Sequence, residues 1–182
     1  MEGDLSSGNH EHSSQPASFL VEHIGLLPKG RALDVAMGSG RNSIYLAGMG
    51  FEVEGVDISP EAVETARQLA RANGVTLRAE VVDLEKNYLI SPTTYDLIIC
   101  FNYLQRSLIP QIKAGLKYGG MIVYETFTVD QIQFGRPRNP DFLLHYNELL
   151  NMFRDFRCLR YREGIFANSQ AIASLIAVKN PG

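Results

Sequence analysis

Apolar and polar positions along this chain repeat with two periods, one typical of strands and one typical of helices. Short apolar segments predict seven strands, at residues 31–36, 52–57, 76–82, 96–101, 121–126, 156–162 and 171–179. Stretches with apolar residues at helical spacing predict the helices, at residues 17–27, 41–48, 59–72, 104–116 and 148–153. This alternation favours an α/β sheet whose strands are joined by right-handed crossovers.

The last two predicted strands depart from this pattern. Only residues 163–170 separate them, which is too short for a helical crossover, so the two strands should pair antiparallel. Residues 117–120 end in two glycines and predict a turn before the fifth strand. The predicted fold is therefore α/β: a doubly wound, mostly parallel seven-stranded sheet with an antiparallel strand near the C-terminus.

Composition favours one folded domain. A chain of 182 residues that is 45% apolar and 20% charged has the makeup of a globular protein with a sizeable core. Residues 1–16 are polar and predict a disordered tail, which leaves residues 17–182 as a single domain. No apolar run reaches the roughly 20 residues that a membrane span needs, and the N-terminus does not resemble a signal peptide.

The two cysteines and the charge narrow the expected partners. Cys100 and Cys158 have neither a disulfide framework nor the spacing of zinc ligands, which fits a reducing cytoplasm. A net charge of -3 does not favour a surface for nucleic acid. We therefore expect a cytoplasmic monomer or homodimer that acts on a small molecule, without a metal, a nucleic acid or a membrane as partner.

The strand at 31–36 runs into the glycine-rich turn Gly38-Ser39-Gly40 and then into a helix. Glycines let backbone N–H groups approach a ligand closely. Asp34 lies inside this strand, where a strand that binds a nicotinamide cofactor would normally be apolar. Its carboxylate would repel a phosphate, but it can accept hydrogen bonds from N–H groups of the loop or, through water, from an amino group. The turn is therefore predicted to hold a zwitterionic amino acid moiety and not a pyrophosphate.

Two more acidic residues follow predicted strands. Asp57 can accept hydrogen bonds from both hydroxyls of a ribose, or it can cap the helix that begins near Ser59. Asp83 can accept a hydrogen bond from the exocyclic amine of an adenine, or it can be a turn residue. Together with Asp34, these acids predict a cofactor with a nucleoside, bound across the carboxyl ends of a parallel sheet.

These residues carry a resemblance to a known family. Residues 31–179 resemble the class I S-adenosylmethionine-dependent methyltransferases: residues 33–40 match the first motif of that family, 56–59 the acidic second motif and 82–84 the third. Where the family usually has Gly-Cys before the glycine, this chain has Ala36-Met37. The resemblance implies S-adenosylmethionine as cofactor and methyl transfer to a small-molecule acceptor.

Within that family, residues 40–47 are similar to the tellurite-resistance branch of small-molecule methyltransferases. The acceptor is left open by this similarity: an oxyanion, a thiol or a small metabolite. By resemblance, the backbone at Ala36, Gly38 and Gly40 would contact the methionine part of the cofactor. Asp57 would contact the ribose, Asp83 the adenine, and residues 100–102 the sulfonium end. The cofactor-binding positions that the resemblance implies are Asp34, Ala36, Met37, Gly38, Gly40, Arg41, Asn42, Asp57, Ile58, Asp83, Leu84, Cys100, Phe101 and Asn102.

Three side chains are candidates for contact with the acceptor: Tyr103, Glu125 and Arg136. Because a sulfonium donor is already activated, alignment and exclusion of water can supply most of the acceleration, and a base is needed only for a protonated acceptor. We expect Tyr103 to be a wall of the pocket. Glu125 either acts on the acceptor or pairs with an arginine. Arg136, with Arg138 in the same loop, either clamps an anionic acceptor or bridges to Glu125 and Asp141.

Other functions remain open from the sequence. A nicotinamide-dependent oxidoreductase can use the same kind of sheet, although Asp34 and the antiparallel closing strands weigh against it. A non-catalytic protein that binds S-adenosylmethionine would use the same cofactor residues. An RNA methyltransferase would be expected to have a basic appendage, and the sequence does not show one.

Overall fold

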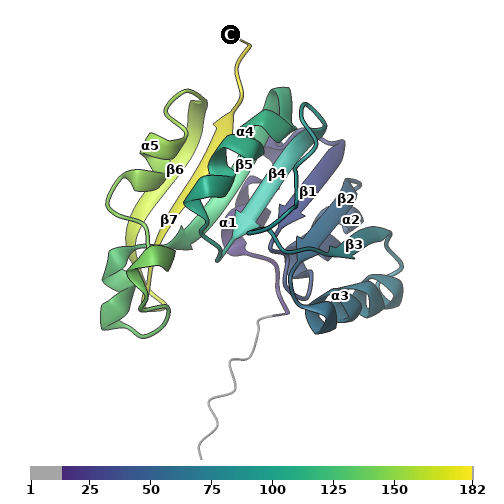
Figure 1. Ribbon diagram of the computed structural model, residues 1–182, viewed down its shortest axis with the longest axis horizontal. Coiled ribbons are helices and arrows are strands. Elements are labelled where there is room, and N and C mark those ends of the chain that lie inside the picture. The colour runs from purple at the N-terminus through teal and green to yellow at the C-terminus, as the bar shows by residue number, and fades with distance from the viewer. Residues whose placement is uncertain (1–13, 182) are drawn as a thin grey trace, which may run out of the picture.

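The centre of the computed structural model, which describes residues 14–181, is a seven-stranded sheet with the order β3-β2-β1-β4-β5-β7-β6 (Figure 1). The strands are β1 (Arg31–Val35), β2 (Glu52–Asp57), β3 (Leu77–Val81), β4 (Tyr95–Phe101), β5 (Leu116–Phe127), β6 (Arg157–Phe166) and β7 (Gln170–Val178). The first five strands are parallel, and β7 is antiparallel to both of its neighbours, β5 and β6. The predicted sheet and the antiparallel pairing of the last two strands are confirmed.

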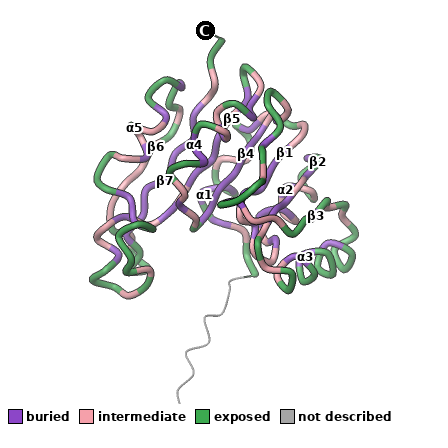
Figure 2. Tube along the Cα trace, viewed as in Figure 1, coloured by how far each residue is buried: buried purple, intermediate pink, exposed green. Residues whose placement is uncertain are grey.

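Helices cover both faces of this sheet. They are α1 (Ser18–His23), α2 (Arg41–Gly48), α3 (Pro60–Ala72), α4 (Ile109–Gly115) and α5 (Glu148–Met152), with the short 3-10 turns η1 (Ile24–Leu26), η2 (Arg106–Leu108), η3 (Val129–Gln133) and η4 (Pro140–Phe142). Successive strand residues point to opposite faces. Accordingly, Leu97 packs in a cluster with residues of α1 and α2, and Ile98 packs with residues of α4 and α5. Buried residues concentrate on the central strands (Figure 2).

The helix at α3 shows how local sequence sets the element boundaries. The Ser59 hydroxyl accepts a hydrogen bond from the Ala62 N–H at 3.1 Å, and Pro60 occupies the first helical position. Both features are typical of a helix start. The helix ends before Gly74, which has a φ of +67°, a conformation that glycine adopts without strain.

The region between β4 and β5 differs from the prediction. The helix expected at 104–116 begins late, because Pro110 lacks an N–H and fits only the first turn, so that η2 precedes a short α4. The turn expected at 117–120 lies inside β5 instead, where the pairing with β4 shifts register. The Gly119 N–H there donates to the Lys179 carbonyl at 2.7 Å, so this irregular stretch is held by the chain after β7.

The final hairpin is also tighter than predicted. β6 continues to Phe166, which pairs with Gln170, so that residues 167–169 alone form the connection. Ser169 adopts a φ of +57°, and its N–H donates to the Phe166 carbonyl at 3.0 Å. Pairing of backbone groups therefore extends further than the apolar pattern of this segment indicates.

Residues 1–13 lie outside the described residues, and most of the predicted tail falls there. The single domain expected from residue 17 onward stays a prediction. Within residues 14–181, every helix falls short of the length and apolar character that a membrane-crossing helix has.

Candidate active site

The glycine-rich loop connects the end of β1 to the start of α2. Ala36, Gly38 and Gly40 all adopt left-handed conformations, with φ of +56°, +58° and +82°. Two of the three are glycines, which take this conformation freely, whereas alanine is strained in it. The loop is anchored by the Met37 N–H, which donates to the Val56 carbonyl at 2.9 Å. The backbone thus makes a tight turn at the carboxyl ends of β1 and β2.

Asp34 is buried beneath this loop, with 2% of its surface exposed. It accepts a hydrogen bond from the Ser43 hydroxyl at 2.6 Å, and within residues 14–181 it forms no ion pair. Burial raises the pKa of Asp34 to about 7, although the Ser43 hydrogen bond and the charge of Arg41 oppose the change. A buried carboxylate without a cation is unfavourable, so the position is suited to a ligand that brings a positive charge.

Asp57, at the end of β2, joins the loop to the following turn. Its Oδ2 accepts a hydrogen bond from the Gly38 N–H at 2.8 Å, and its Oδ1 accepts one from the Ser59 N–H at 2.9 Å. The side-chain cap of α3 is Ser59, so the helix-cap alternative for Asp57 does not apply. The carboxylate is half-buried and lies beside the glycine-rich loop.

The predicted cofactor positions that follow Asp57 and Asp83 in the sequence differ in exposure. Ile58 is 63% exposed directly after Asp57, whereas Leu84 is 7% exposed and belongs to the core. Asp83 accepts a hydrogen bond from the Glu85 N–H at 3.0 Å and pairs with Lys86 at 3.3 Å. Asp83 thus makes local contacts in the turn after β3, and its contact with an adenine stays a prediction, while Ile58 presents an apolar surface to solvent.

Three other predicted cofactor residues use their side chains to hold neighbouring segments. The Asn42 Oδ1 accepts a hydrogen bond from the Ala17 N–H at 2.8 Å, and the Arg41 Nη1 donates to the Gln15 carbonyl at 3.1 Å. Met37 packs in an apolar cluster with α3. These three side chains contact other parts of the protein, so the backbone of these residues is the part that can contact a ligand.

The end of β4 forms the next part of the site. Asn102 has a φ of +57°, and its N–H donates to the Glu125 carbonyl at 2.9 Å. Cys100 and Phe101 are buried, and burial raises the pKa of the Cys100 thiol to about 12. Burial likewise raises the pKa of Tyr103 to about 12, and its hydroxyl donates to Gln105 at 2.6 Å. The phenol therefore stays protonated at neutral pH, which agrees with a pocket wall.

Glu125, on β5, pairs with Arg162 and not with Arg136 or Arg138, the arginines considered from the sequence. Its Oε2 accepts a hydrogen bond from the Ser174 hydroxyl at 2.5 Å and contacts the Arg162 Nη2 at 3.4 Å. The bridge from Arg136 or Arg138 to Glu125 or Asp141 is absent: both arginines are exposed, and neither forms an ion pair within residues 14–181.

Sequence reasoning missed Arg162 and Ser174. The two residues are Cα partners across the β6–β7 hairpin, and Ser174 is the partner of Glu125 on β5. The three residues form a row across adjacent strands. The pattern of apolar residues does not predict such a row, because the row depends on how the strands are aligned with one another. Among the residues that the structure describes, no group of His, Cys, Asp and Glu is arranged to hold a metal ion.

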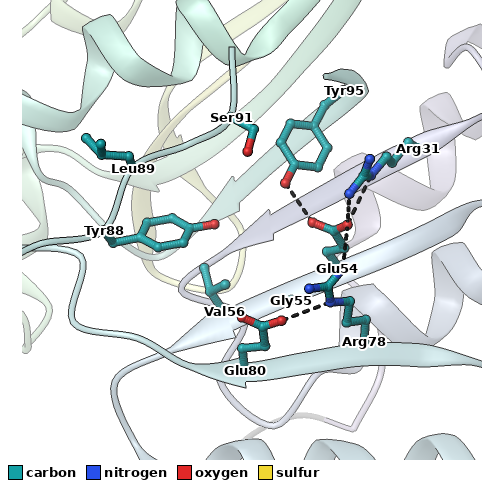
Figure 3. Close-up of a pocket in the computed structure, with 10 residues that line it drawn as sticks. All are labelled: Arg31, Glu54, Gly55, Val56, Arg78, Glu80, Tyr88, Leu89, Ser91 and Tyr95. Atoms are coloured by element: carbon teal, nitrogen blue, oxygen red, sulfur yellow. Dashed lines mark hydrogen bonds and ion pairs between the residues drawn. The ribbon is translucent and has the colours of Figure 1, made fainter. Parts of the chain in front are cut away.

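Two cavities lie near this site without containing it. One, of about 160 Å³, lies under the loop at 82–94 (Figure 3). Figure 3 shows the Tyr95 hydroxyl and Arg31 directed at Glu54, and Arg78 paired with Glu80. The other, of about 420 Å³, lies between α2 and α3 beside Ser39. Ser39 and Arg41 of the loop region line the second cavity, but neither cavity is lined by Asp57 or by the end of β4.

Comparisons with known proteins agree with this geometry. Residues 32–120 match the family described as "Methyltransferase domain". The fold is also that of TehB from Haemophilus influenzae, with a TM-score of 0.75 at 20% identity over 90% of this chain and 62% of that one. Together, these matches support a class I S-adenosylmethionine-dependent methyltransferase. The domain supports S-adenosylmethionine as the cofactor and weighs against the nicotinamide alternative.

Two further proteins are similar to this chain, one in structure and one in sequence. An S-adenosylmethionine-dependent methyltransferase from Clostridium acetobutylicum has a TM-score of 0.68 at 15% identity, covering 90% of this chain and 89% of that one. A ubiquinone biosynthesis O-methyltransferase from Burkholderia multivorans is 30% identical over 122 residues, which cover 64% of this chain and 52% of that protein. The chain thus spans about half the length of the relatives that it matches in sequence.

Proposed function

We propose that this protein binds S-adenosylmethionine across the glycine-rich loop and transfers its methyl group to a small-molecule acceptor. The observation that carries the proposal is the joint placement of Asp57 and Asp34. Asp57 is held by the Gly38 and Ser59 N–H groups, and Asp34 is buried under the same loop without a cation. A ribose and an amino acid ammonium group would complete these two acids.

The residues around the loop fit such a cofactor in shape. A Cβ added at Gly38 would meet no described atom within 4 Å, so the space above this glycine is open to a ligand. Ile58 offers an exposed apolar side chain for an adenine ring, next to the carboxylate that would hold the ribose. When bound, S-adenosylmethionine supplies a methyl group on a sulfonium that needs no further activation.

The acceptor would lie over the ends of β4 and β5. Asn102 and Glu125 are joined there through the backbone, and Tyr103 forms a wall. The Glu125 Oε1 has no hydrogen-bond partner within the described chain, which makes it the candidate to take a proton from a hydroxyl acceptor. Arg136 remains a candidate clamp on the loop above. An oxygen acceptor is favoured over a thiol because the sequence relative is named an O-methyltransferase.

Titration calorimetry tests cofactor binding directly. We expect S-adenosylhomocysteine to bind and NAD not to bind. Asp57→Asn should weaken S-adenosylhomocysteine binding at least tenfold, which corresponds to about 1.4 kcal/mol. The reason is that the carboxylate has two oxygens that can accept hydrogen bonds from the ribose hydroxyls, whereas the amide has only one. Glu61→Gln, on the first turn of α3, is the matched control and should bind normally. Binding of NAD alone would contradict the proposal.

A turnover assay then separates an enzyme from a cofactor-binding protein. Labelled methyl donor is incubated with a panel of oxyanions, hydroxylated metabolites, thiols and amines. Transfer to one oxygen class supports the proposed reaction. Tight binding of S-adenosylhomocysteine with no transfer to any acceptor favours the non-catalytic alternative. The expected cytoplasmic location, the monomeric or homodimeric state and the absence of nucleic-acid or membrane partners stay predictions.

A further inference from the structure

Arg162 lies in a row of side chains that crosses the acceptor end of the sheet. Phe101 pairs with Glu125, Glu125 with Ser174 and Ser174 with Arg162, each as Cα partners on adjacent strands. Because Phe101 is the last residue of β4, this row reaches the carboxyl edge where open α/β sheets bind ligands. The row therefore connects Arg162 to the region in which the methyl group would be transferred.

The guanidinium of Arg162 contacts two aromatic rings. Its Cζ lies 4.9 Å from the centre of the Phe19 ring and 4.8 Å from the centre of the Phe166 ring. Contacts with two rings limit the orientations of the guanidinium, which reduces the entropy lost when it binds a ligand. The side chain is still 30% exposed, so this fixed cation remains within reach of a solute.

Most hydrogen-bond donors of this guanidinium are unused. Its Nε donates to the Ser174 hydroxyl at 3.2 Å and its Nη2 donates to Glu125 at 3.4 Å, while its Nη1 has no partner within residues 14–181. Charge-assisted N–H···O bonds are normally about 2.7–2.9 Å long, so the contact with Glu125 is loose. An arginine has five N–H donors arranged for bidentate binding of an oxyanion, and the Nη1–Nη2 edge is free for that purpose.

Helix α1 places this cluster close to the cofactor loop. The Ala17 N–H, just before α1, binds Asn42 in the first turn of α2, and Phe19 contacts Arg162. These two contacts lie two residues apart on the chain. Arg162 and the cofactor loop are therefore linked through the start of α1.

We propose that Arg162 binds an anionic group of the methyl acceptor, a carboxylate or an inorganic oxyanion, and that Ser174 and the Oε2 atom of Glu125 position the guanidinium. This inference rests on the proposed methyl transfer and names the acceptor class. Arg136 and Arg138, the arginines singled out from the sequence, are exposed and form no ring contacts in the described chain. Arg162 is the arginine that the fold holds ready at this end of the sheet.

Binding of small probes tests the inference at constant ionic strength. Benzoate, selenite and the neutral benzamide are titrated into the full chain by calorimetry, with and without S-adenosylhomocysteine. We expect benzoate or selenite to bind at least tenfold more tightly than benzamide, and the preferred anion identifies the acceptor source. Arg162→Gln should abolish the preference. Arg157→Gln, at an exposed arginine that is the first residue of the same strand, should retain it.

Two outcomes would overturn the inference: neither benzoate nor selenite binds the unmodified protein more tightly than benzamide, or Arg162→Gln preserves the anion preference. Arg162→Lys should retain a partial preference, and circular dichroism confirms that each variant is folded. A failure of the proposed cofactor is distinguishable, since it shows as absent binding of S-adenosylhomocysteine, whereas anion binding by Arg162 is measured without the cofactor as well.

Discussion

Asp34 is a carboxylate that the fold buries with a serine hydroxyl as its hydrogen-bond partner. Its pKa in the folded protein, about 7, lies well above the ordinary value of 3.8. Between these two pH values, the unfolded chain loses the proton and the folded chain keeps it. The contribution of this group to the free energy of unfolding therefore falls as the pH rises from about 4 to about 7.

The substitution Asp34→Asn should separate stability from ligand binding. Asparagine removes the charge and can still accept the Ser43 hydrogen bond, so we expect the variant to be more stable than the wild type at pH 8, by about 1–3 kcal/mol. Its advantage should vanish near pH 4. Binding of S-adenosylhomocysteine should weaken, because the ammonium group loses its counter-charge. Urea unfolding at both pH values and calorimetry provide the measurements; a variant of unchanged stability at pH 8 would count against the buried charge.

Predictability at the residue scale depends on whether a contact is local. Asp34 and Asp57 could be assigned from the sequence, because the order strand, loop, helix places them at one edge. Arg162 could not be assigned in this way, since a β-bulge between Cys158 and Arg160 shifts the register of β6. One extra residue in a strand reverses the face to which every later side chain points. The arginine that pairs with Glu125 could therefore not be predicted from the pattern of apolar and polar residues.

At the scale of elements, the glycine-rich loop has two glycines with different surroundings. A Cβ added at Gly40 would lie 2.9 Å from the Ala66 Cβ of α3, whereas a Cβ at Gly38 would face open space. Both positions have a positive φ, which is unfavourable for alanine. The loop thus contacts the protein through Gly40 and is open to a ligand at Gly38.

These surroundings predict opposite effects for two alanine substitutions. Gly40→Ala should destabilise the protein by about 2–4 kcal/mol, because α3 must move away in addition to the backbone strain. Gly38→Ala should cost only about 1–2 kcal/mol of stability, yet it should weaken S-adenosylhomocysteine binding more than tenfold, since the methyl group occupies the ligand's space. Chemical unfolding and calorimetry on both variants test this pair. Normal affinity in Gly38→Ala would place the cofactor elsewhere.

Element boundaries were predicted well where capping residues mark them. Ser59 and Pro60 defined the start of α3, and the strands at 31–36 and 52–57 were found within one residue. The segment at 104–120 was not, because Leu116 begins β5 and the following glycines form an irregular part of that strand. The pairing that decides this comes from β4 and from the chain after β7, both distant in sequence.

At the scale of the whole molecule, the ionic cluster of Figure 3 joins the first four strands on the face covered by the loop at 82–94. Glu54 on β2 accepts hydrogen bonds from the Tyr95 hydroxyl of β4 at 2.6 Å and from the Arg31 Nε of β1 at 3.0 Å. Arg78 of β3 lies 3.7 Å away. Although burial acts to raise the pKa of Glu54, these partners hold it below the ordinary value.

Removal of the Glu54 carboxylate should lower the stability of the sheet. We expect Glu54→Gln to lower the free energy of unfolding by about 1–3 kcal/mol, because Arg31 and Tyr95 lose a charged partner that is only partly exposed. Since the folded pKa is lowered, this contribution is present above the ordinary pKa of 4.5 and is lost as the pH falls below it. Glu52→Gln, exposed on the same strand, is the control. Equal unfolding curves for the two variants would show that the cluster adds nothing.

The match to the methyltransferase family ends at residue 120, inside β5. Asp34, Asp57 and the glycine-rich loop precede that point, whereas Glu125, Arg136, Arg162 and Ser174 all follow it. On the proposed function, donor recognition lies in the first part of the chain, and the residues proposed to contact the recipient, Tyr103 excepted, lie in the last part. We therefore expect that exchanging residues 121–181 between proteins of this fold changes the recipient of the methyl group and leaves the affinity for the donor unchanged.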